Sequence, residues 1–182
     1  MEAIKTLVYR RQNDDRRLQE AKSSLIEAVQ SGSIRSVKEL LDEGVDVNTK
    51  GDDGLTAIAV ASGKGYTEVV NLLLNNGAQI ETRDNDGRTP LMYAARNGQT
   101  EVVRRLVSAG ADVNTQSNDG ISALGFASYE GYIDIVNILV ENGAQMKTRD
   151  NLGRTPLMYA AANGQTEVVR RLVSAGADVN TT

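Results

Sequence analysis

The chain has 182 residues, a formal net charge of −4, and no cysteine, histidine or tryptophan. Without cysteine and histidine it can form no disulfide or thiolate, and a zinc site would need carboxylates alone, so we expect no metal centre. The acidic balance argues against general nucleic-acid binding, which needs clustered positive charge, and no apolar run approaches the ~18 residues of a membrane span.

Residues 1–15 are expected to form an N-terminal helical extension. They lack the apolar core of a signal peptide, which predicts a cytoplasmic protein without membrane contact. Ile4, Leu7 and Val8 give a small apolar patch, and Asn13 followed by two aspartates is typical of a helix start. We expect this extension to cap the segment that follows it. The alternative is a free arm or an oligomerisation element.

Glycine recurs every 33 residues through the rest of the chain, as in the series Gly54, Gly87, Gly120 and Gly153. A fixed period of this length predicts stacked structural units rather than one globular core. Aligning the series divides the chain into five units, with expected boundaries at 16–48, 49–81, 82–114, 115–147 and 148–182. The first of these is expected to act as an N-terminal cap of the array.

One unit, residues 82–114, shows the expected local structure. The segment Asp84-Asn85-Asp86-Gly87 predicts a turn, because short polar side chains bond their own backbone and glycine accepts positive φ. Thr89 and Pro90 predict a helix start, followed by a narrow apolar face. A second helix is expected from about Thr100, with one apolar face turned inward. The unit is therefore a turn, a short helix, a second turn, a longer helix and a loop.

These residues carry a resemblance to a known family. The pattern D-x-x-G-x-T-P-L, A-A-x-x-G, E-V-V, A-G-A-D-V-N resembles the ankyrin repeat and covers roughly residues 16–182. The resemblance implies an all-α ankyrin-repeat solenoid, with turn tips and first helices on a concave face and second helices on the back. The family usually has histidine after T-P-L. This chain instead has Ile26, Ala59, Met92, Gly125 and Met158, so we expect apolar packing alone to replace that polar link.

The third and fifth units are near copies, differing only where Leu152 replaces Asp86 and Ala162 replaces Arg96. This indicates either a natural two-repeat duplication or an engineered chain. The last unit lacks a distinct polar cap, so we expect its outward side to expose apolar surface that the third unit buries. A self-associating structural or engineered repeat protein, forming a homo-oligomer through this C-terminal repeat, is therefore the alternative function.

The sequence offers no catalytic or cofactor motif. An EF-hand alignment of the Asp-rich turn places Thr82 first and Tyr93 twelfth, where calcium binding requires Asp and Glu. Without histidine and cysteine the usual nucleophile–base pairs are missing. We expect no enzyme activity and no cofactor.

The expected function is that of a non-catalytic scaffold, which binds a protein partner through the concave face. The resemblance places partner contacts at turn tips and at the exposed ends of first helices. The candidate contact residues are Leu55, Asp86, Arg88, Arg96, Asn118, Ile121, Tyr129, Glu130, Leu152 and Arg154. We expect a centre at Ile121, Tyr129 and Leu152, flanked by the arginines Arg88 and Arg154. In the alternative interpretation, the nearby aromatic residues, Phe126 and Tyr132 among them, fill space between repeats.

Overall fold

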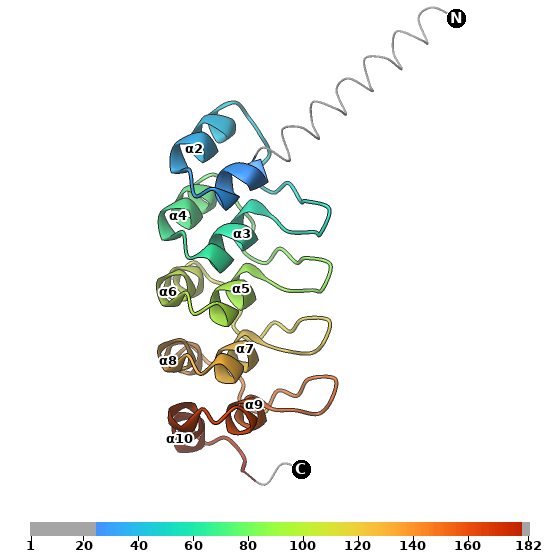
Figure 1. The fold of residues 1–182 in the computed structure, drawn as a ribbon, viewed down its shortest axis with the longest axis vertical. Coiled ribbons are helices and arrows are strands. Elements are labelled where there is room, and N and C mark those ends of the chain that lie inside the picture. Colours follow the sequence, from blue (N-terminus) through green and yellow to red (C-terminus); the bar gives the residue numbers. More distant parts are fainter. Residues whose placement is uncertain (1–24, 180–182) are drawn as a thin grey trace, which may run out of the picture.

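The computed structural model describes residues 25–179, which form one stack of helix pairs joined by extended loops (Figure 1). Residues 25–30 are helical, and the helices that follow are α2 (Ile34–Asp42), α3 (Ala57–Lys64), α4 (Thr67–Asn75), α5 (Pro90–Arg96), α6 (Thr100–Ser108), α7 (Ala123–Glu130), α8 (Ile133–Glu141), α9 (Pro156–Ala162) and α10 (Thr166–Ser174). Residues 25–179 contain no β-strand, only the isolated bridges Lys50–Thr56 and Gln116–Ser122. The predicted all-α solenoid is confirmed. The extension predicted for residues 1–15 lies outside the described residues.

The helices form two layers (Figure 1). Helices α3, α5, α7 and α9 lie one above another in the first layer, and α2, α4, α6, α8 and α10 form the second. The turn loops all project to the same side of the first layer. We call the surface made by the first-layer helices and these loops the inner face. No helix within residues 25–179 has the length and apolar character that crossing a bilayer requires.

Helix α5 shows how the sequence sets each first-layer helix. The Thr89 hydroxyl accepts a hydrogen bond from the Met92 backbone N–H at 3.3 Å, and Pro90 occupies the first turn, where no N–H is needed. Ala94 and Ala95 are fully buried, and their small side chains let α3 and α7 pack closely on both sides. A helix this short does not persist alone, so its stability comes from these neighbours.

The core runs through the stack as two columns of buried aliphatic side chains. Successive repeats place equivalent residues in each column, with Ile58, Leu91 and Leu124 in the first layer and Leu73, Leu106, Leu139 and Leu172 in the second. Each such side chain stabilises the fold by roughly 2 kcal/mol relative to exposure. Because the columns are continuous, each repeat is stabilised mainly by its neighbours.

Asparagines at the turn tips join successive repeats by hydrogen bonds. The backbone N–H of Asn118 donates to Asp86 O at 2.9 Å, and that of Asn151 donates to Asp119 O at 3.0 Å. The side-chain amide of Asn118 also donates to Asn85 O at 3.0 Å, and that of Asn151 to Asn118 O at 2.9 Å. The expectation that apolar packing alone replaces the missing polar link is therefore wrong. Polar links run through the loops, where carbonyls of one turn accept hydrogen bonds from amides of the next, and also join second-layer helices, where Arg171 Nε donates to Asn137 Oδ1 at 2.6 Å.

The outward side of the last helix pair exposes apolar side chains whose counterparts are buried inside the stack. Val113 is 7% exposed, whereas the equivalent Val179 is 62% exposed. Ala95 is buried, and the equivalent Ala161 is exposed. The predicted exposure of this surface is confirmed within the described residues. Among the helices of residues 25–179, α9 and α10 have neighbours on one side only, so their other side stays uncovered by this part of the chain.

Candidate functional site

A hollow of about 280 Å³ opens on the inner face where α5, α7 and α9 meet. Predicted contact residues form most of its wall, namely Arg88, Arg96, Ile121, Tyr129, Glu130 and Arg154. The rest of the lining is Gly125, Phe126 and Tyr159. The third, fourth and fifth repeats all contribute, so the stacking of the repeats builds the hollow.

Aromatic rings form the apolar part of the hollow. Tyr129, at the C-terminal end of α7, is 48% exposed, and its ring lies 6.0 Å from that of Tyr159 in an edge-to-face arrangement. Phe126, one turn earlier on α7, is half-buried, and the Arg96 guanidinium lies 6.0 Å from the centre of its ring. Edge-to-face and cation–π pairs add to area burial, so these contacts help to hold the arrangement in place within the fold.

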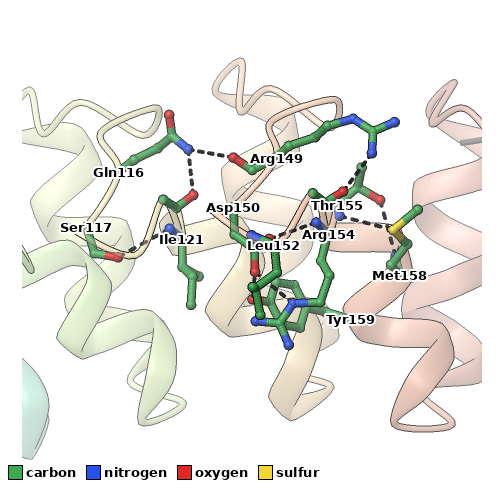
Figure 2. Close-up of polar contacts among 12 residues, drawn as sticks. Gln116, Ser117, Ile121, Arg149, Asp150, Leu152, Arg154, Thr155, Met158 and Tyr159 are labelled. Carbon is green, nitrogen blue, oxygen red and sulfur yellow. Dashed lines mark hydrogen bonds and ion pairs between the residues drawn. The ribbon is translucent and has the colours of Figure 1, made fainter. Parts of the chain in front are cut away.

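Asp150 organises one edge of the hollow (Figure 2). Its Oδ1 accepts the backbone N–H groups of Leu152 and Arg154 at 2.9 and 2.7 Å. Its Oδ2 accepts the Tyr159 hydroxyl and, at 2.8 Å, the Arg154 Nε–H. The Arg154 guanidinium lies 4.8 Å from the Tyr159 ring centre. The buried carboxylate thus fixes both the arginine and the tyrosine.

The third repeat holds its equivalent arginine differently. Asp84 accepts the Tyr93 hydroxyl and the Arg88 backbone N–H, as Asp150 does with its own partners. The Arg88 side chain, however, turns to Asp86, with its Nη1 3.1 Å from Oδ2. The fifth repeat has Leu152 in place of Asp86, so no carboxylate lies there to compete for Arg154. One of the two differences between these repeats therefore accompanies a change in the arginine's partner.

The contacts of Asp150 shift the pKa values in this cluster. Burial opposes the charge on Asp150, but the hydrogen bonds from Tyr159, Arg154 and the Leu152 backbone outweigh it and lower its pKa to about 2. Burial raises the pKa of Tyr159 to about 12, and its hydrogen bond to the Asp150 carboxylate adds to the rise. At neutral pH the cluster therefore holds a charged carboxylate and a neutral phenol.

We expect the Asp150 carboxyl group to remain ionised at pH 3. An NMR titration that follows the chemical shift of its carboxyl carbon measures this. An ordinary aspartate, with a pKa of about 3.9, is mostly protonated at that pH. Because the folded pKa lies below the unfolded one, the cluster stabilises the fold above about pH 4, and that contribution is lost as the pH falls toward 2. Tyr159→Phe removes a hydrogen bond to the carboxylate and should raise the titration midpoint of Asp150. Asp150→Asn removes the titrating group and so assigns its resonance. A wild-type midpoint near pH 4 would contradict the hydrogen-bonded geometry.

The other predicted contact residues lie outside this hollow. Leu55 lines a wider hollow of about 700 Å³ against α3 and α5. Asp86 forms its ion pair with Arg88 beside the smaller hollow. Leu152, at a turn tip, is 76% exposed. Asn118 lies at a turn tip too, but its side-chain amide already donates to Asn85 O within the stack.

The aromatic residues divide between filling space and lining the hollow. The ring of Tyr132 packs on Gly98 so closely that a Cβ there would lie 2.9 Å from it, which agrees with the space-filling interpretation. Phe126 lines the hollow. Tyr159 also lines it, yet it was not among the predicted contact residues. The sequence could have identified Tyr159, because it occupies the same repeat position as Tyr93 and Phe126, with 33 residues between successive members.

Comparison with protein families agrees with this architecture. The family described as ankyrin repeats (3 copies) matches residues 25–117 and 109–182, which together make up most of the chain. The chain is an ankyrin-repeat protein. A search of curated proteins gave no match. Ankyrin repeats generally mediate protein–protein interactions and are typically non-catalytic. Within this ankyrin stack, the hollow brings the exposed Tyr129 together with arginine side chains, and tyrosine and arginine are residue types often found at the energetic centres of interfaces.

Proposed function

We propose that this ankyrin-repeat protein is a non-catalytic scaffold that binds a protein partner through its inner face, centred on the hollow between α5, α7 and α9. The observation that supports the proposal is the exposed Tyr129 beside Ile121, Phe126 and Tyr159, with arginines around them. Such a centre buries much area while freezing few torsions. Because the surrounding contacts already order the side chains, association has little further conformational entropy to lose.

The proposal can be tested with a displayed library of random peptides selected on the immobilised chain. We expect selected peptides to bind the wild-type chain and to lose on the order of 10- to 100-fold in affinity for Ile121→Ala/Tyr129→Ala, because both side chains line the hollow. Val173→Ala removes an exposed aliphatic chain from α10, outside the hollow, and should leave binding unchanged. Circular dichroism checks that each variant is folded.

Two results of this selection would contradict the proposal. The first is a library from which no peptide is enriched. The second is a set of selected peptides that bind the double variant as tightly as the wild type, which would place the binding surface elsewhere.

Self-association is a second candidate function, supported by the apolar outward side of α9 and α10. Val173 and Val179 are both exposed there. Light scattering coupled to size exclusion, over a wide concentration range, distinguishes the two. A mass constant near 19.6 kDa favours the scaffold. A mass of two or more chains that falls on Val173→Asp substitution favours self-association through this surface.

A further inference from the structure

Arginine predominates among the charged residues that line the hollow, although the chain as a whole is acidic. Arg88, Arg96 and Arg154 line it, with Glu130 as the only acidic lining residue among those described. The whole chain, by contrast, carries a net charge of −4. Arginine beside aromatic and aliphatic surface is a typical setting for recognising carboxylates, because the guanidinium stacks on rings through its face and donates hydrogen bonds from its edge.

Each of the three arginines keeps donors that the fold does not use. Arg154 donates to Asp150 only through Nε, which leaves its terminal nitrogens for a partner. Arg96 is exposed, and its guanidinium lies over the ring of Phe126. Within residues 25–179 it makes no hydrogen bond or ion pair. The Nε of Arg88 is buried without an acceptor, while its Nη1 contacts Asp86. The fold thus stacks or anchors these cations without using all of their donors.

Charge and apolar character alternate along the inner face. The residue that follows each turn glycine is Leu55, then Arg88, then Ile121, then Arg154, one in each successive repeat. Leu55 lines the wider hollow, and the other three line the smaller one. A partner segment lying along the stack therefore meets apolar and basic side chains in turn.

From this alternation we infer that the partner presents an acidic-apolar peptide segment, in which a Glu or Asp carboxylate pairs with Arg96 or Arg154 and a neighbouring apolar side chain packs against Ile121 and Tyr129. This inference rests on the proposed function. A polypeptide fits better than a nucleic acid, because a phosphate backbone would meet Glu130, Asp86 and Asp150 as well as the arginines. A single carboxylate can pair with one guanidinium and avoid these acids.

The test uses peptides selected from the random library on the wild-type chain. We expect an excess of Glu and Asp next to Leu, Ile, Phe or Tyr. For a synthesised selected peptide, changing its acidic residue to the neutral isostere (Glu to Gln or Asp to Asn) should weaken binding about tenfold or more, and raised salt should weaken the acidic form more than the neutral one.

A matched pair of double variants connects that preference to the hollow. Arg96→Ala/Arg154→Ala should weaken binding of the acidic peptide by about tenfold or more and bind the neutral isostere about as the wild type does. Arg104→Ala/Arg170→Ala removes the same charge from the third and fifth repeats, but on α6 and α10 in the second layer, and should change affinity less than about twofold. Arg96→Ala alone repeats a difference already present in the chain, since the fifth repeat has Ala162 there, and provides a variant expected to fold normally.

The outcomes separate this inference from the proposed function. If selected peptides need Ile121 and Tyr129 but show no acidic excess, or if the neutral isostere binds equally well, the inference is wrong and the scaffold proposal stands. If the two arginine double variants behave alike, the inference is also wrong, because the carboxylate then responds to net charge alone. If no peptide is enriched, both proposals fail.

Discussion

Leu91→Ala is expected to lower the free energy of unfolding by about 3 kcal/mol, whereas Leu157→Ala should lower it by about 1 kcal/mol. The two leucines occupy the same position of near-identical repeats, so the deleted atoms are the same. Leu91 is fully buried, because α5 packs between α3 and α7. Leu157 on α9 is partly exposed and has α7 as its only first-layer neighbour among the described helices. Its removal therefore leaves a smaller cavity.

Urea unfolding followed by helical circular dichroism measures both changes. The last helix pair of a stack can unfold ahead of the rest, so Leu157→Ala is also expected to broaden the transition, whereas Leu91→Ala shifts it as a whole. Equal losses at the two positions would show that Leu157 is covered as fully as Leu91.

Gly87→Ala is expected to cost about 3 kcal/mol and Gly153→Ala about 1 kcal/mol, again at equivalent positions. Both glycines have positive φ, 73° and 79°, which costs about 1 kcal/mol for alanine. At Gly87 the new Cβ would also lie 2.3 Å from Asn118 Oδ1 and 2.9 Å from the Asn118 backbone N. The amide oxygen can rotate away, but the backbone cannot move without breaking the Asn118 N–H bond to Asp86 O. At Gly153 the nearest atom is 3.8 Å away, on the flexible Arg149 side chain.

The same urea titration, with both alanine variants and the wild type, measures this difference. The cost at Gly153 isolates the backbone strain, and the excess at Gly87 isolates the contact between turns. Equal destabilisation of the two variants would contradict the expected clash with Asn118 and show that the loops can move apart there without cost.

The sequence predicted the helical stack because its signals are local. Thr89 and Pro90 define a helix start, and small and aliphatic residues at helical spacing define the buried faces. The exposed apolar surface of the last unit was also predicted by comparing near-identical repeats, and Val179 is one of its residues. The links between Asn85, Asn118 and Asn151 were missed, because they depend on how far apart the stacked turns lie.

The sequence predicted which residues line the candidate site better than it predicted the ion pairs that they form. Most of its wall came from aligning turn tips and helix ends, as with Arg96, Ile121 and Tyr129. The fifth repeat has Leu152 in place of Asp86, so only Asp150 lies near Arg154 in the local sequence. In the third repeat, Asp84 and Asp86 both lie near Arg88, and its pairing with Asp86 was not predictable, because the choice depends on which carboxylate lies closer in space.

The exchange of arginine partners has a consequence for how such an array changes over evolutionary time. Asp86 and Leu152 lie at exposed turn tips, outside the buried columns that hold the stack together. A single substitution at a turn tip can therefore accompany a change in the ion-pair partner of the nearby arginine while the buried core stays the same. Duplicated repeats of this kind can acquire distinct binding preferences one residue at a time, with each step nearly neutral for folding.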